Sequence, residues 1–155
     1  YAQKGMTGMN RKGLLRCNDD MTVAGPKHAY FAAQRVFSIF DGTLERIRDF
    51  KFSTAAAGKL AVFGYHKKGS SAVLVAVWLS GAAPADSDAV TPVDLTFNDV
   101  KFTDPVLADL LTGKVYEIPR DRWTAEGAAT VFKQMPIYDS PVLIAERILL
   151  TSVPE

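Results

Sequence analysis

The chain has 155 residues and a net charge of +1, and 48% of its residues are hydrophobic against 23% charged. This composition predicts one ordinary domain with a buried core and excludes a mainly disordered chain. The small net charge argues against nucleic acid or a membrane surface as the partner, and the single Cys17 excludes a disulfide framework and a multi-cysteine zinc site.

Residues 1–27 are predicted to be irregular, because several glycines and a proline interrupt any helical or strand period: Gly5, Gly8, Gly13, Gly25 and Pro26. The segment is basic, but no alternation of aromatic and basic residues follows it, so a surface loop is a better interpretation than a nucleic-acid arm. The chain begins at Tyr1 rather than Met, and we therefore expect a piece of a longer protein.

Residues 28–41 are predicted to form one helix, which Pro26 precedes and Gly42 ends. Apolar side chains recur at three- and four-residue spacing on one face, and others widen this stripe over most of the circumference. One sheet cannot cover such a helix, so we expect it to contact a missing domain or a second copy of the chain. The interface candidates are Tyr30, Phe31, Phe37 and Phe40.

Residues 42–155 are predicted to form an antiparallel β-sandwich of about eight strands, because the period of the pattern changes to two after the helix. The runs 59–66 and 71–79 around a short turn indicate a β-hairpin, and the second run is apolar enough to be buried on both faces. The other expected strands are 44–52, 93–97, 105–111, 114–118, 129–135 and 141–149. Gly113 is expected at the position of a tight turn that needs a positive φ, and Pro136 is expected to end one strand. The predicted fold is mainly β with one N-terminal helix.

No catalytic residue, cofactor or metal site is predicted. The run 40–44 (FDGTL) is similar to the first motif of haloacid-dehalogenase-like phosphatases, but Ile39 stands where that family has its nucleophilic aspartate. The only imidazoles, His28 and His66, have no companion ligands at metal-binding spacing. No phosphate-binding loop or nucleophile elbow is present.

Aromatic rings can bind sugars by stacking on the apolar face of a pyranose, and two rings outside the apolar runs are candidates. Trp123 follows a charged stretch and Tyr138 precedes a turn, so both are candidate carbohydrate-binding residues. The alternative for Trp123 is a loop tryptophan folded back over the edge of the core. Trp78 lies inside the run 71–79 and is predicted to be structural.

The segments 12–16 (KGLLR), 26–34 (PKHAYFAAQ) and 36–41 (VFSIFD) resemble a junction in multi-domain glycoside hydrolases with a (β/α)8 catalytic barrel. In that family the last barrel loop and helix lead into a β-sandwich. Three later segments resemble a strand, a hairpin and the closing strand pair of that family's sandwich, in the same order: 75–78 (VAVW), 109–116 (DLLTGKVY) and 135–144 (MPIYDSPVLI).

This resemblance implies a helix from a barrel followed by an accessory sandwich, without the catalytic site. In barrel glycosidases the two catalytic carboxylates lie at the ends of earlier strands, which would precede Tyr1. The resemblance also implies a secreted or extracytoplasmic protein, whereas the sequence by itself leaves the compartment open.

Two functions therefore remain after the sequence analysis. The first is a non-catalytic accessory domain of a carbohydrate-active enzyme, which braces the barrel and contacts glycan. The second is a free-standing binding or structural sandwich without a catalytic partner.

Overall fold

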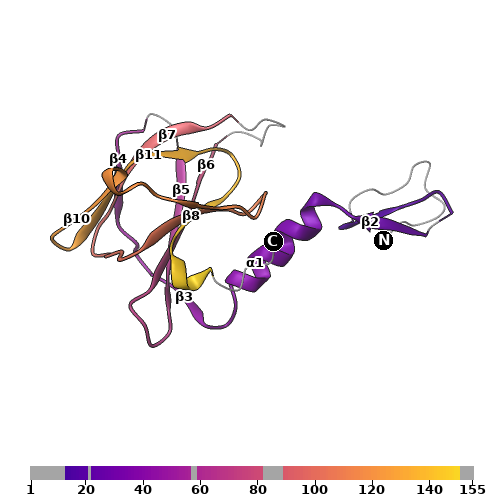
Figure 1. Ribbon diagram of the computed structural model, residues 1–155, viewed down its shortest axis with the longest axis horizontal. Coiled ribbons are helices and arrows are strands. Elements are labelled where there is room, and N and C mark those ends of the chain that lie inside the picture. Colours follow the sequence, from indigo (N-terminus) through magenta and orange to yellow (C-terminus); the bar gives the residue numbers. More distant parts are fainter. Residues whose placement is uncertain (1–12, 21, 57–58, 82–88, 151–155) are drawn as a thin grey trace.

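Two antiparallel sheets pack face to face, and one helix and a small hairpin extend away from one end of them (Figure 1). The computed structural model describes residues 13–20, 22–56, 59–81 and 89–150. Within these residues the protein is mainly β, with twelve strands, one α-helix and two short 3-10 turns. The predicted fold class is confirmed, although the strands are more numerous and several are shorter than the sequence indicated.

The larger sheet has six strands in the order β3-β5-β6-β12-β8-β9. Their bounds are β3 Leu44–Arg46, β5 Leu60–Lys67, β6 Val73–Leu79, β12 Val142–Glu146, β8 Pro105–Asp109 and β9 Val115–Glu117. Strands β5 and β6 form the hairpin that the sequence predicts, and the Lys67 amide donates to the Ala72 carbonyl at the turn (3.0 Å). Residues 73–77 are all buried, as expected for a central strand covered on both faces.

The smaller sheet has four strands in the order β10-β11-β7-β4. Their bounds are β10 Trp123–Glu126, β11 Ala129–Ile137, β7 Thr91–Phe97 and β4 Phe52–Thr54. A bulge interrupts the pairing of β11 with β7 between Phe132 and Met135. There Gln134 adopts a φ of 52°, and its amide donates to a carboxylate oxygen of Asp94 (2.7 Å).

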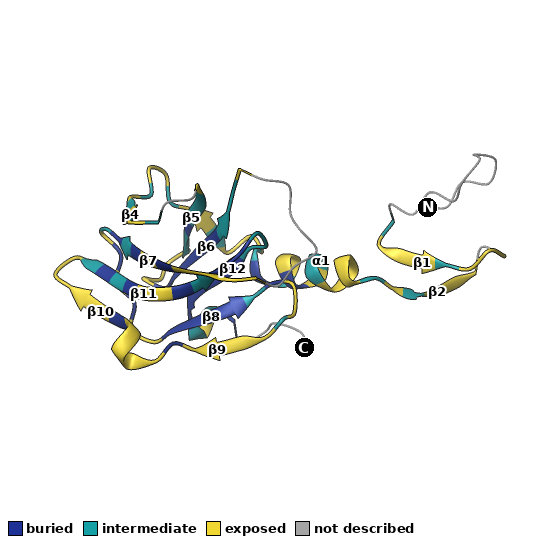
Figure 2. Cartoon of the chain, turned by 90° about the horizontal axis from the view of Figure 1, so that it is seen from above, coloured by how far each residue is buried: buried dark blue, intermediate teal, exposed yellow. Residues whose placement is uncertain are grey.

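The main core lies between the two sheets and is rich in aromatic rings. Phe97, Phe102 and Phe132 contact one another with ring centroids 5.3–6.3 Å apart. Inward-facing valines of β6 and β7 complete this layer, in the alternation expected for packed sheets: Val73, Val75, Val77 and Val93. Figure 2 shows that the buried residues concentrate in the two sheets.

A second apolar layer covers the outer face of the larger sheet. It contains small and medium side chains of the three neighbouring strands β6, β12 and β8, namely Leu74, Ala76, Val106, Ala108, Leu143 and Ala145. Ile39 at the end of the helix and Leu150 near the end of the described chain pack on this layer. Only the C-terminal end of the helix therefore covers part of the outer face.

We call the helix and the hairpin before it the arm, residues 13–39. It contains β1 (Leu15–Cys17), β2 (Val23–Pro26) and α1 (His28–Ile39). Figures 1 and 2 both show the arm extending beyond the sandwich, so that α1 meets the sheets only near its C-terminal end. The helix agrees with the predicted one, but the prediction of irregular backbone over 1–27 is wrong for the hairpin that β1 and β2 form.

The predicted strand 44–52 is also wrong, because it is two strands in different sheets. β3 pairs with β5 and β4 pairs with β7, and the residues between them carry the chain from one sheet to the other. Asp49 makes this turn with a φ of 55°.

The prediction that Pro136 ends a strand is wrong as well, since β11 continues to Ile137 and Pro136 lies opposite Pro92. The strand β10 lies between two predicted strands and was not expected.

Candidate functional site

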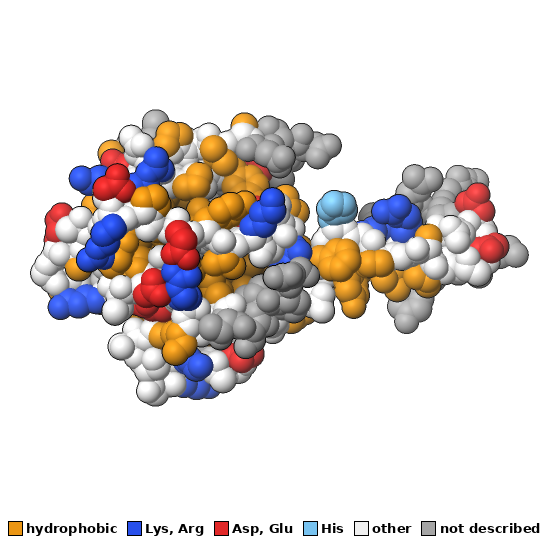
Figure 3. All heavy atoms as spheres, in the orientation of Figure 1, with side chains coloured by type: hydrophobic (Ala, Val, Ile, Leu, Met, Phe, Trp, Pro, Cys, Tyr) orange, Lys and Arg blue, Asp and Glu red, His pale blue; other side chains and the backbone are white. Residues whose placement is uncertain are grey.

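The exposed part of α1 carries large apolar side chains. Phe37 is 76% exposed, and Tyr30 and Phe31 are 39% and 38% exposed. The rings of Tyr30 and Phe31 contact each other edge to face, with centroids 5.6 Å apart. Hydrophobic side chains gather on the arm in the space-filling view of Figure 3. Three of the four interface candidates are thus accessible to a partner.

Phe40, the fourth interface candidate, lies where the helix meets the sandwich. It is half-buried, and its ring packs edge to face on Tyr65 of β5, with centroids 5.0 Å apart. The residue belongs to the second apolar layer, so its contact is made within the chain. It stands just after α1, where the helix has already reached the sheet.

A buried arginine attaches the arm to the sandwich. Arg35 is only 9% exposed, and its Nη1 donates to the carbonyl oxygens of Leu111 (2.7 Å) and Leu110 (3.5 Å). These carbonyls belong to the turn between β8 and β9. Gly113 in the same turn has a φ of 77°, and a Cβ there would collide with the guanidinium group of Arg35. The positive φ at Gly113 agrees with the sequence prediction.

Trp123 lies in the core and has both ring faces covered. It is 7% exposed and stacks on Phe132, with centroids 6.3 Å apart. The guanidinium carbon of Arg120 lies 3.8 Å from the centroid of the tryptophan ring. The alternative reading of Trp123, as a tryptophan folded over the core edge, describes this position. Its carbohydrate-binding role stays a prediction that the burial does not favour.

Tyr138 is buried too, and its hydroxyl group makes a hydrogen bond within the sandwich. It is 7% exposed, and its hydroxyl donates to Oδ1 of Asp109 (2.7 Å). The same carboxylate also accepts from the Leu111 amide (2.8 Å) and from the Thr112 hydroxyl (2.7 Å). Tyr138 therefore holds Asp109 in place rather than presenting its own ring to solvent.

An apolar cleft of about 340 Å³ opens beside Tyr138, between the edges of the two sheets. Residues of both sheets line it, and most are apolar: Val90, Leu107, Ile118, Pro119, Met135, Pro136 and Val142. Asp109, Tyr116, Glu117 and Arg122 are further lining residues with polar groups. The sequence analysis did not single out Tyr116, although an aromatic residue on an edge strand is a usable signal.

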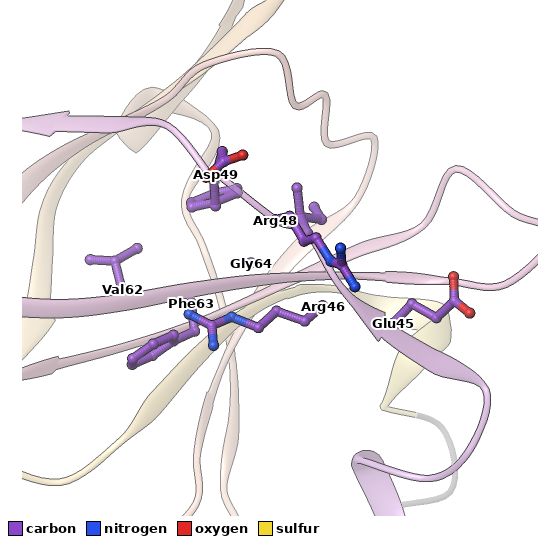
Figure 4. A pocket seen from close by; sticks show the side chains of 9 residues that line it. Glu45, Arg46, Arg48, Asp49, Val62, Phe63 and Gly64 are labelled. Atoms are coloured by element: carbon purple, nitrogen blue, oxygen red, sulfur yellow. The ribbon is translucent and has the colours of Figure 1, made fainter.

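A second, wider hollow of about 880 Å³ lies beside β3 and β5 (Figure 4). The guanidinium group of Arg46 lies 4.7 Å from the ring centroid of Phe63, which stacks on Trp78 at 5.3 Å. Trp78 is half-buried at the end of β6, so it is packed against the protein but not enclosed. Gly64 lines the same hollow, and a Cβ at this position would collide with the ring of Phe50.

One exposed charge network joins three elements on the surface of the sandwich. Arg147 donates to both carboxylate oxygens of Asp104 and to both of Glu117, at 2.5–3.2 Å. These hydrogen bonds lower the pKa of Asp104 and of Glu117 and raise that of Arg147. The network ties β9 and the residue before β8 to the 3-10 turn Arg147–Leu149.

The described residues bring together no group of three or more His, Cys, Asp and Glu side chains that could hold a metal ion. His66 lies 3.6 Å from a carboxylate oxygen of Glu45, whereas His28 is the first residue of α1.

Within the part of the chain that the structure describes, no helix has the length and apolar character needed to cross a bilayer.

Comparisons with known proteins give one distant likeness. No family model matches the sequence, and no curated protein matches it. A solved structure of a rhamnosidase from Novosphingobium sp. PP1Y matches 64% of this chain with 22% sequence identity and a TM-score of 0.44. The chain spans 8% of the length of that rhamnosidase. A likeness of this size carries no argument about function.

Proposed function

We propose that this chain is a non-catalytic accessory β-sandwich domain of a carbohydrate-active enzyme, and that its arm binds the catalytic barrel domain. The observation that carries the proposal is the exposure of Tyr30, Phe31 and Phe37 on a helix whose C-terminal part is anchored in the sandwich through Arg35. The resemblance of residues 12–41 to the junction after a catalytic barrel supplies the identity of the partner.

The energetics of the arm support a protein partner. Burying a fully exposed aromatic side chain contributes about 1.5–3 kcal/mol, so Phe37 would gain most of this amount, and the less exposed Tyr30 and Phe31 a smaller part of it. Three such rings on one short helix, next to further exposed apolar residues of the hairpin, form a patch of the kind that marks an interface. The exposed residues of the hairpin are Leu14, Leu15 and Val23.

The test uses the gene that encodes the chain. If the reading frame upstream encodes a (β/α)8 barrel, the barrel is expressed separately and mixed with the chain. We expect the two to elute together in size-exclusion chromatography. Phe37→Asp should abolish this association, because a carboxylate would have to be buried without a partner. The matched control is Val115→Asp on β9, which is exposed on the sandwich at 44% and should leave the association unchanged.

Two results would contradict the proposal. One is an upstream frame without a barrel, combined with a homodimer of the chain that Phe37→Asp dissociates; this result would favour a free-standing module. The other is hydrolysis of aryl glycosides by the purified chain, abolished by a carboxylate substitution in it, because the proposal assigns the chemistry to another domain.

A further inference from the structure

The apolar cleft beside Tyr138 has the dimensions of a small ligand site. Its volume of about 340 Å³ lies in the lower part of the range of roughly 300–1,000 Å³ that ligand pockets occupy. Its floor consists of core residues that the sandwich holds in place, namely Leu107, Ile118, Met135 and Val142. The cleft is therefore a preformed hollow with a rigid apolar floor.

Tyr116 presents an aromatic ring at the edge of this cleft. It lies directly opposite Leu107 in the pairing of β8 with β9. Directly opposed residues of an antiparallel pair share one face of the sheet, and Leu107 belongs to the core between the sheets. The ring of Tyr116 thus lies on the inner side of an edge strand, yet the residue remains 47% exposed. It can stack on a ligand that rests on the apolar floor.

Two charged groups of opposite sign complete the lining. The carboxylate of Asp109 accepts three hydrogen bonds, from Tyr138, Leu111 and Thr112, which fix its position. A carboxylate offers about four acceptor sites, so Asp109 keeps one for a ligand. Arg122 adds a guanidinium group with five N–H donors.

Glu117 also lines the cleft, but its carboxylate is neutralised by Arg147 and adds no second free negative charge there. Glu117 pairs with Val106, which lies in the outer apolar layer of the larger sheet. Both of its carboxylate oxygens accept hydrogen bonds from Arg147. The charges available to a ligand are therefore one carboxylate and one guanidinium group, which balance each other.

This combination fits a neutral ligand with one apolar face and hydroxyl groups around its edge. An ion of either sign would meet a like charge in the cleft, whereas hydroxyl groups can donate to Asp109 and accept from Arg122. We infer that the cleft binds a single pyranose ring of a neutral saccharide, which stacks on Tyr116. The inference rests on the proposed function in that it gives the accessory domain its glycan contact.

The experiment titrates the full chain with methyl pyranosides of neutral hexoses and follows the amide chemical shifts by NMR. At least one glycoside should shift the amides of β8 and β9 in a saturable way. Tyr116→Ala should weaken binding by about tenfold, the size of one aromatic contact. Tyr116→Phe should retain most of the affinity, and Arg122→Gln should reduce it. The matched controls, Tyr30→Ala on the arm and Arg120→Gln on the Trp123 ring, should bind as the wild type does.

Three results would overturn the inference. They are no saturable binding of any neutral glycoside, equal binding of cyclohexanol, or unchanged affinity in both Tyr116→Ala and Arg122→Gln. Tighter binding of a methyl glucuronide than of the neutral glycosides would also contradict it, because it would make the cleft an anion site. Phe37→Asp separates the two proposals, since it should abolish binding to the barrel and leave sugar binding intact.

Discussion

The sandwich and the arm use the same kinds of side chain in opposite environments. Phe132 in β11 is fully buried among other aromatic rings, whereas Phe37 in α1 is 76% exposed. The sandwich closes its core by packing two sheets, and the arm has only one end against them. An apolar pattern therefore shows where a surface must be covered, but the cover can lie in another molecule or domain.

The largest expected effect comes from truncating the same residue type in the two regions. Phe132→Ala should lower the free energy of unfolding by about 3–5 kcal/mol, because it leaves a cavity between the sheets. Phe37→Ala should change it by no more than about 0.5 kcal/mol, since the ring touches little of the chain. Urea denaturation of both variants measures the difference. Equal losses would show that the arm is covered within the chain and would remove the contrast.

The second prediction concerns Trp123, which the sequence left between two roles. Trp123→Ala should destabilise the chain by about 3 kcal/mol, at the lower end of the range for large buried aromatic residues. The ring stacks on Phe132 on one side, but on the other only the Arg120 side chain covers it. Thermal denaturation tests this expectation. If the variant keeps its stability and loses affinity for sugar, then Trp123 is a binding platform after all.

The third prediction concerns the attachment between the two regions. Arg35→Ala should cost about 1–3 kcal/mol, because it leaves the buried carbonyl of Leu110 and the part-buried carbonyl of Leu111 without their donor. Hydrogen exchange should speed up in α1 and in the turn between β8 and β9 more than in β6. The neighbouring Gln34→Ala, on the same helix, serves as the control. Uniform exchange changes throughout the sheets would mean that Arg35 supports the core rather than the attachment.

The smallest effect is expected at the exposed network around Arg147. The folded state lowers the pKa of Asp104 and of Glu117, so these groups stabilise it above their unfolded pKa values of about 4. That contribution is lost as the pH falls through the lower folded values. Arg147→Gln should therefore be less stable than the wild type at neutral pH, and the two should converge in acid. A difference that persists at pH 2 would contradict the assignment.

The sequence predicted the elements that local patterns specify. The run 71–79 has too many apolar residues for a surface strand, and the structure buries its centre on both faces. Gly113 was expected at a positive φ because a tight turn requires one. The helix at 28–39 followed from its spacing and its flanking proline and glycine. In each case the signal is contained within a few adjacent residues.

The remaining features depend on residues far apart in the sequence. Nothing local shows that 44–52 divides between two sheets, since either half has the pattern of a strand. The cleft needs Tyr116 of β9 and Tyr138 to line the same space, and this depends on the pairing of β8 with β9 and on the hydrogen bond from Tyr138 to Asp109 of β8. Burial of Trp123 likewise depends on the position of Phe132 in β11.

The bond between Arg35 and the turn at Gly113 has a mechanical consequence. A rotation of α1 against the sandwich would have to break these buried hydrogen bonds or move the turn with the helix. The same turn joins the strands that carry Asp109 and Tyr116, two residues of the cleft. A partner that shifts the helix would thus move Asp109 and Tyr116 in the cleft through the side chain of Arg35. Because free-energy coupling between two sites is reciprocal, a ligand in the cleft would equally change how tightly the arm is held.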